Sequence, residues 1–270
     1  MLLAGILLLS AVIALLVDWL IPVNFLLIFL VLAALAFVFL WGSCQLVDLK
    51  KPQEKDSPFY RTMAYLYIET IILAARVHLH KEGMEKVPAQ GRFLLVCNHT
   101  SDADPALLLH AFRKSQLAFI SKRENDQKFI VGKLMHKLLC QPINRENDRE
   151  ALKTILKCIE IIKEDKASIA VFPEGYIHDD RKLHPFRHGV FKIAQRTGVP
   201  IVVCTMKGVV PVFRNATRLK RTDIYLRVLD VIQPEEYAGL TTVRLGERIH
   251  RMMAEDLGPD LVAEEMFVCQ

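Results

Sequence analysis

The sequence predicts an α/β fold, with a mixed central sheet flanked by helices and an N-terminal membrane-embedded helical hairpin. Residues 1–47 contain no Lys or Arg and one acidic residue, Asp18, and 39 of them are apolar. After residue 58, short apolar runs alternate with amphipathic stretches, as strands and helices do in α/β proteins. The mean hydropathy of +0.24 is therefore concentrated at one end. This contrast excludes a disordered chain, a collagen-like chain, a small disulfide scaffold and a polytopic transporter.

The N-terminal region contains two apolar stretches, Met1–Val17 and Val23–Gly42. As helices they would extend about 25 and 30 Å, close to the thickness of the bilayer core. We expect a helical hairpin, and the short first arm leaves open whether it spans the bilayer or lies in one leaflet. Turn-forming residues and an aromatic residue suited to the interface lie between the arms: Asp18, Pro22, Asn24 and Trp19.

We divide the chain into a membrane hairpin at 1–47, a charged linker at 48–58 and a domain at 59–270. The first basic residues, Lys50, Lys51 and Lys55, follow the second arm and indicate a cytoplasmic domain. Six cysteines without a Cys-x-x-Cys pair also favour a reducing compartment.

The charge of the chain favours a lipid partner. The formal net charge is +5, so residues 48–270 carry +6 once Asp18 is set aside. A basic domain at a bilayer is attracted to anionic lipid head groups and anionic substrates. We find no nucleic-acid-binding motif and expect no nucleic-acid partner.

The 59–270 region begins with a predicted helix, Phe59–Val77, which either lies along the membrane surface or packs in the core. Seven strands are predicted after it: Val77–Lys81, Phe93–Asn98, Ala118–Ser121, Ile143–Arg145, Ala167–Phe172, Ile201–Lys207 and Ile224–Val231. Five helices alternate with them: Pro105–Phe112, Gln127–Leu139, Arg149–Glu164, Gly189–Thr197 and Val243–Leu257.

The first candidate site lies between the strand Phe93–Asn98 and the next helix. His99 and Asp104 are separated by four residues there, at the strand end where α/β folds place active sites. A carboxylate bound to one imidazole nitrogen orients the ring and leaves the other nitrogen as a general base. Asp104 before Pro105 also suits a helix N-cap, although a cap does not account for His99.

Two further segments carry candidate residues. Glu174 and Gly175 close the strand Ala167–Phe172, and glycine allows a ligand to approach the backbone closely. Arg145 offers a planar fork for a phosphate group, or is an exposed loop residue.

Four blocks in this order resemble the glycerolipid acyltransferase family, which includes bacterial 1-acyl-sn-glycerol-3-phosphate acyltransferases. They are Asn-His-x4-Asp at 98–104, the Arg145 block, Phe-Pro-Glu-Gly at 172–175 and Val-Pro-Ile at 199–201. The resemblance covers roughly residues 76–215. The family usually continues Phe-Pro-Glu-Gly with Thr or Ser and then Arg, whereas this chain has Tyr176 and Ile177. Three other cations are therefore candidates for phosphate or donor contacts: Lys122, Arg181 and Arg187.

The resemblance implies transfer of a fatty acyl group from acyl-CoA or acyl carrier protein to the sn-2 hydroxyl of lysophosphatidic acid, in phospholipid biosynthesis. His99 would be the general base and Asp104 its partner, Arg145 would bind the phosphate, and Glu174 and Gly175 would shape the acceptor site. No cofactor and no metal would be needed. The expected partners are membrane lipids, the lysophospholipid and the acyl donor.

Three alternatives stay open. The same chemistry fits glycerol 3-phosphate or a lysolipid with another head group. A non-catalytic membrane-binding protein is the second. A metal-dependent hydrolase is the third, although its candidate ligands match no common zinc spacing: His178, Asp179, Asp180, His184 and His188.

Overall fold

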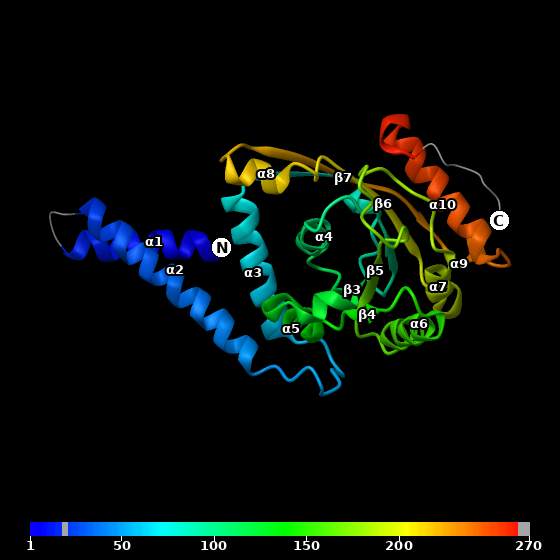
Figure 1. Cartoon of the computed structure of the whole chain (residues 1–270), viewed down its shortest axis with the longest axis horizontal. Coiled ribbons are helices and arrows are strands. Elements are labelled where there is room, and N and C mark those ends of the chain that lie inside the picture. The colour runs from blue at the N-terminus through cyan, green and yellow to red at the C-terminus, as the bar shows by residue number, and fades with distance from the viewer. Residues whose placement is uncertain (18–20, 264–270) are drawn as a thin grey trace.

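The N-terminal hairpin stands out from the rest of the molecule in the computed structural model (Figure 1), which describes residues 1–17 and 21–263. Helix α1 spans Leu2–Val17 and helix α2 spans Ile21–Gln45. Within the described residues, one helical stretch, Asn24–Gln45, is long and apolar enough to cross a membrane. The helical pair predicted from composition is thus present, and its longer arm has the dimensions of a membrane span.

Helix α2 begins two residues before the predicted second arm. Asp18 and Trp19 lie outside the described residues. Pro22 and Asn24, expected in the turn, instead lie in the first turn of α2. Proline is compatible with the start of a helix because the first backbone N–H groups have no intrahelical acceptor.

Helix α3 (Pro58–Ala74) joins the hairpin to the rest of the molecule. The Tyr60 hydroxyl donates to the Ser43 carbonyl of α2 (2.8 Å). Arg61 is buried, pairs with Asp56 at 2.7 Å and donates to the Leu117 carbonyl at the sheet. α3 therefore packs against the sheet layer on one side, while the exposed Ile71 lies on the other.

A seven-stranded mixed sheet forms the centre of the molecule, in the order β1-β7-β6-β2-β5-β3-β4. All neighbours are parallel except β6 and β7, which are antiparallel. The predicted mixed sheet is confirmed. Its strands are β1 Val77–Glu82, β2 Leu94–Val96, β3 Leu117–Lys122, β4 Gln141–Ile143, β5 Ser168–Val171, β6 Ile201–Lys207 and β7 Thr222–Ile232.

The strand predicted at Ile143–Arg145 begins earlier, at Gln141. Pro142 lies inside β4, which is possible because β4 is the edge strand and needs no backbone donor on its open side. Arg145 consequently lies in the turn after the strand.

Helices cover both faces of the sheet: α3 and α4 lie on one side and α6, α7 and α10 on the other (Figure 1). Two predicted helices begin with 3₁₀ turns, η2 before α5 and η3 before α7. Helices α8 and α9 were not predicted. The bounds are α4 Asp104–Ala111, η2 Arg123–Gln127, α5 Phe129–Lys137, α6 Asp148–Lys163, η3 His188–Phe191, α7 Lys192–Thr197, α8 Val212–Thr217, α9 Pro234–Tyr237 and α10 Thr242–Leu257, with short 3₁₀ turns at η1 Met84–Lys86 and η4 Pro259–Leu261.

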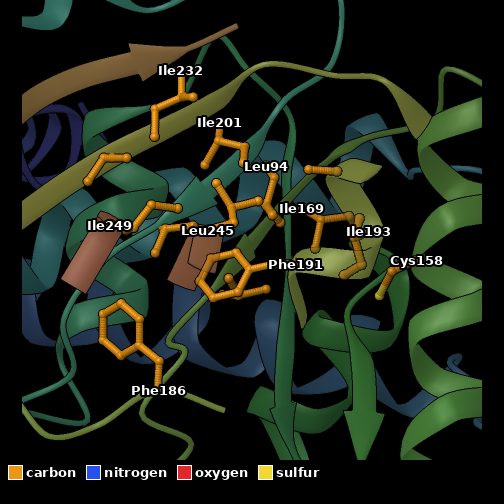
Figure 2. Close-up of a cluster of buried hydrophobic side chains, with 14 of the residues drawn as sticks. Leu94, Cys158, Ile169, Phe186, Phe191, Ile193, Ile201, Ile232, Leu245 and Ile249 are labelled. Carbon is orange, nitrogen blue, oxygen red and sulfur yellow. The ribbon is translucent and has the colours of Figure 1, made fainter. Parts of the chain in front are cut away.

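The hydrophobic core is divided by the sheet into two layers. Alternate residues of β2 face opposite sides, so Leu94 packs with α6, α7 and α10, whereas Leu95 packs with α3 and α4. In the first layer Phe191 lies between β2 and α10, beside Leu245 and Ile249 (Figure 2). The central strands are packed on both faces by these layers. The carboxyl ends of the strands carry the candidate site.

Candidate active site

The carboxyl ends of four parallel strands form one edge of the sheet. β2, β5, β3 and β4 are neighbours and run in the same direction. The loops after them begin at Cys97, Phe172, Arg123 and Asn144. The sheet therefore brings the predicted His99, Glu174 and Arg145 segments, which are far apart in the sequence, to the same edge.

His99 and Asp104 contact each other directly. The Nδ1 atom of His99 lies 2.9 Å from Oδ2 of Asp104, whose side chain is fully buried. An ionised carboxylate only accepts hydrogen bonds, so this contact places the proton on Nδ1 and leaves the Nε2 lone pair available. The ring also stacks on Phe172, with centroids 4.1 Å apart. Packing and hydrogen bonding thus fix one orientation of the imidazole.

Asp104 is not the N-cap of the following helix. It is the first residue of α4, and Ala103 occupies the cap position without a side-chain cap bond. Instead, Oδ2 of Asp104 accepts the backbone N–H groups of Thr100 and Ser101, at 2.7 and 2.9 Å. The N-cap alternative is therefore wrong: the carboxylate folds back onto the loop before the helix and holds it around His99.

Asn98 fixes the base of this loop. Its side-chain amide donates to the Met206 carbonyl (3.0 Å) and its oxygen accepts the Met206 N–H (2.8 Å), so the loop is tied to β6. The sequence placed Asn98 in the first block but gave it no role. The only feature of the sequence that could have indicated this role is that Asn98 is a polar residue at the end of an apolar strand.

Glu174 is buried and connects two loops. One carboxyl oxygen accepts the backbone N–H of His99 at 2.7 Å, and the other accepts that of His184 at 3.0 Å. Burial raises the pKa of Glu174 to about 8, although both N–H bonds act to lower it. Glu174 holds the His99 backbone in position, a role the sequence did not predict.

Gly175 is required by its backbone conformation and by a close side chain. Its φ is +84°, and a Cβ atom there would lie 2.9 Å from Cδ of Arg187. The sequence predicted a close approach of a ligand to this glycine. In the structure the group that approaches is the Arg187 side chain.

Arg145 and Arg187 meet at Tyr176. Each guanidinium carbon lies 4.9 Å from the centroid of the Tyr176 ring. Arg187 also donates to the Tyr176 hydroxyl (3.1 Å) and to the Arg145 carbonyl (3.2 Å). Burial lowers the pKa of Arg145, and the nearby positive charge of Arg187 acts in the same direction. Two cations from different loops thus contact the same tyrosine ring. An anion bound beside Tyr176 would be attracted to both.

The acyltransferase family model matches residues 78–207, the part of the chain that contains all of these side chains. Residues 78–207 are thus similar to the acyltransferase family. A probable 1-acyl-sn-glycerol-3-phosphate acyltransferase of Mycoplasma pneumoniae is 30% identical over 178 residues, which cover 64% of each chain. The chloroplastic 1-acyl-sn-glycerol-3-phosphate acyltransferase BAT2 of Brassica napus is 34% identical over 128 residues, 47% of this chain and 36% of that one. The chain thus spans less than two thirds of the length of either relative.

A solved structure shares the fold of this chain. The crystal structure of the 1-acyl-sn-glycerophosphate acyltransferase PlsC from Thermotoga maritima matches with a TM-score of 0.61 at 22% identity. The match covers 81% of this chain and 86% of that one.

The two remaining predicted cations have different surroundings in the structure. Arg181 donates to the Thr100 carbonyl at 3.0 Å, so it braces the loop that carries His99. Lys122 is half exposed at the end of β3 and pairs with Glu124 at 3.3 Å. The structure therefore joins Arg181 to the His99 loop and leaves Lys122 in a surface ion pair.

Two histidines of the 178–188 segment, His178 and His184, form a stack. The rings of His178 and His184 are stacked with centroids 3.6 Å apart, and Nε2 of His184 lies 2.9 Å from Asp180. Among the described residues, no group of three or more His, Cys, Asp or Glu side chains is arranged to hold a metal ion. These side chains hold the loop next to Glu174, which accepts the backbone N–H of His184.

Proposed function

We propose that this chain transfers a fatty acyl group from an acyl thioester, acyl-CoA or acyl carrier protein, to the sn-2 hydroxyl of lysophosphatidic acid, giving phosphatidic acid. The observation that carries the proposal is the His99–Asp104 pair, with Nδ1 engaged and Nε2 available. The names of the relatives from Mycoplasma and Brassica support the choice of reaction and acceptor.

In the proposed mechanism His99 acts on the acceptor hydroxyl. Nε2 accepts the hydroxyl proton as the oxygen attacks the thioester carbonyl carbon. The C–S bond then breaks, and the imidazolium returns the proton to the departing thiolate. Asp104 stabilises the imidazolium between these steps. General-base catalysis of this kind typically contributes about 10²–10⁴ in rate. The products are the ester and the free thiol, so the reaction requires no cofactor.

We assign Arg145 and Arg187 to the acceptor phosphate. Guanidinium groups form paired hydrogen bonds with phosphate oxygens, and Tyr176 holds these two groups together. Arg187 would thus supply the cation that the family usually carries two residues after its glycine. Glu174 has both oxygens engaged by backbone N–H groups, so we assign it to positioning His99.

We further propose that the protein works at a membrane, with residues 48–270 on the cytoplasmic side. The long apolar helix α2 and the basic residues that follow it support this location. An acceptor lipid would then keep its acyl chain in the bilayer while its head group reaches His99.

Transfer to glycerol 3-phosphate or to a lysolipid with another head group is the second candidate function. Tyr176 and Ile177 favour it, because they replace the Thr or Ser and the Arg that the family usually has. Under this proposal Tyr176 would shape a different head-group site.

The test is an acyl-transfer assay with the full chain in membranes. Lysophosphatidic acid, glycerol 3-phosphate and lysolipids with choline, ethanolamine or glycerol head groups would be offered with acyl-CoA or acyl carrier protein. We expect transfer to lysophosphatidic acid, and a loss of about 10²–10⁴ in kcat for His99→Ala and Asp104→Asn.

Arg196→Gln, on an exposed site of α7, is the control. Undiminished transfer by His99→Ala would refute the catalytic assignment. Transfer to another acceptor alone would select the second candidate. A protein that transfers to none of them would be a non-catalytic membrane-binding protein.

A further inference from the structure

Helix α8 and the residues around it carry an exposed apolar and basic surface. Three large apolar side chains are more than half exposed: Val210 (52%), Phe213 (60%) and Leu219 (68%). Three exposed basic residues lie in the same segment: Arg214, Arg218 and Lys220. We call these six residues the α8 surface. Exposed apolar side chains next to exposed basic ones in a short segment are typical of segments that lie in the interface of an anionic membrane.

The basic residues of the α8 surface are not neutralised within the described chain. Arg221, the next residue, pairs with Asp223 at 2.6 Å. No Asp or Glu side chain of the described residues lies within ion-pair distance of Arg214, Arg218 or Lys220. Their charge is therefore available to an external anion.

The α8 surface lies near the start of the hairpin. The N-terminal amine of Met1 pairs with Glu69 of α3 at 3.3 Å. Just beyond the end of α3, Arg76 donates to the Leu219 carbonyl at 2.8 Å. Figure 1 shows α8 beside this end of α3, on the same side of the sheet as α1 and α2. A membrane that receives the hairpin from this side would come close to α8.

We propose that the α8 surface is a second membrane contact, which binds the anionic head-group region beside the hairpin. Phe213, Val210 and Leu219 would enter the interface, and the three cations would contact lipid phosphates. A second copy of the chain is a poor partner, because a symmetric contact would set the same cations against one another. The contact would fix the tilt of the domain on the bilayer, and it does not depend on the proposed reaction.

The test uses a single tryptophan as a fluorescent probe of the α8 surface in the full chain. Trp19 and Trp41 are replaced by Phe, Phe213→Trp is introduced, and the protein is reconstituted into vesicles of equal parts phosphatidylcholine and phosphatidylglycerol. In a second preparation the lipids carry bromine atoms near the top of their acyl chains, and these atoms quench the fluorescence of any tryptophan in the interface. We expect the fluorescence of the Phe213→Trp protein to be blue-shifted and quenched. Val243→Trp, at an exposed position of α10, is the matched control and should show neither effect.

Replacing the three basic residues of the α8 surface tests whether this surface binds the membrane or only lies near it. Arg214→Gln, Arg218→Gln and Lys220→Gln together should lower the ratio of docked to undocked probe at position 213 about a hundredfold, since each cation near an anionic surface contributes about fivefold. The hairpin keeps these variants on the vesicle, which flotation verifies. Leu219→Trp repeats the measurement at a second position.

Three results would overturn the proposal. One is solvent-exposed emission from the Phe213→Trp protein while it floats with the vesicles. Another is equal quenching of the Val243→Trp control. The third is a blue shift that appears in detergent and rises with protein concentration, which would mark a contact between copies of the chain.

Discussion

The buried carboxyl group of Glu174 links the two loops that border His99. Both oxygens accept backbone N–H groups, and the side chain is 3% exposed. Such a group adds to the stability of the fold in a pH-dependent way, because burial raises its pKa from 4.5 to about 8. The native state therefore retains a proton that the unfolded chain has lost between those pH values.

We expect the contribution of Glu174 to the free energy of unfolding to fall as the pH rises from about 4.5 to 8. The contribution of Glu174 is complete below its unfolded pKa and is lost as the pH passes its folded pKa, with a slope of at most about 1.4 kcal/mol per pH unit. Urea unfolding in detergent at a series of pH values measures this slope. The wild-type slope should be more negative than that of Glu174→Gln, which has no carboxyl group to titrate at this position. Equal slopes for the two proteins would contradict the prediction.

Arg187 provides a second prediction at the residue scale. If it holds the acceptor phosphate with Arg145, Arg187→Gln removes charge-assisted hydrogen bonds of about 1.5–3 kcal/mol. We expect the KM for lysophosphatidic acid to rise about ten- to hundredfold, with a smaller change in kcat. Tyr176→Ala should act in the same direction, because it removes the ring against which both guanidiniums pack.

Steady-state kinetics with the acceptor varied would measure both effects. Arg196→Gln removes the same charge from α7 and should leave the KM unchanged. An equal rise in KM for this control would show a general effect of charge rather than a phosphate site.

At the scale of elements, α10 approaches the 3₁₀ turn η3 closely at Gly246. A Cβ atom there would lie 2.4 Å from Nδ1 of His188 and 2.9 Å from the Phe191 ring. In an ordinary helix interior, replacing Gly by Ala stabilises by about 1 kcal/mol. Here overpacking of about 1–3 kcal/mol exceeds that gain.

We therefore expect Gly246→Ala to destabilise the protein. Thermal unfolding or urea unfolding would show a lower midpoint than wild type. Glu247→Ala, an exposed change one residue along the same helix, should have little effect. A higher midpoint for Gly246→Ala would mean that α10 moves away from η3 without penalty.

The elements that the sequence predicted best are long or strongly apolar. β6 was predicted at its observed bounds, and α10 within one residue, because continuous apolar runs and helical periodicity are local signals. Helices α8 and α9 have six and four residues and are too short to show periodicity. The antiparallel pairing of β7 with β6 depends on tertiary contacts that no local pattern records.

The same distinction applies to the candidate site. The contact between His99 and Asp104 was expected, because four residues between a strand and a helix allow the two side chains to meet. The meeting of Arg145 with Arg187 at Tyr176 depends on how two separate loops pack, so their spacing in the sequence could not indicate it.

At the scale of the whole molecule, the orientation in the membrane is the main expectation to test. Glu54 is an exposed linker position, so Glu54→Cys in a Cys269→Ser background can react with a membrane-impermeant maleimide. We expect labelling in inverted membrane vesicles and none in right-side-out vesicles. We also expect the chain to stay in the membrane during alkaline carbonate extraction. Labelling of right-side-out vesicles alone would reverse the proposed orientation.

The tie between Asn98 and Met206 has a consequence for the order of events during protein synthesis. The base of the loop that carries His99 is tied to β6 through Asn98, so this tie forms only after β6 has been added to the sheet, long after residues 1–45 have left the ribosome. Because a chain emerges from its N-terminus, the hairpin can enter the bilayer first. Under the proposed function, the catalytic arrangement would be completed on a polypeptide that is already anchored in the membrane. A prematurely terminated chain ending before residue 206 would then be bound to the membrane but inactive.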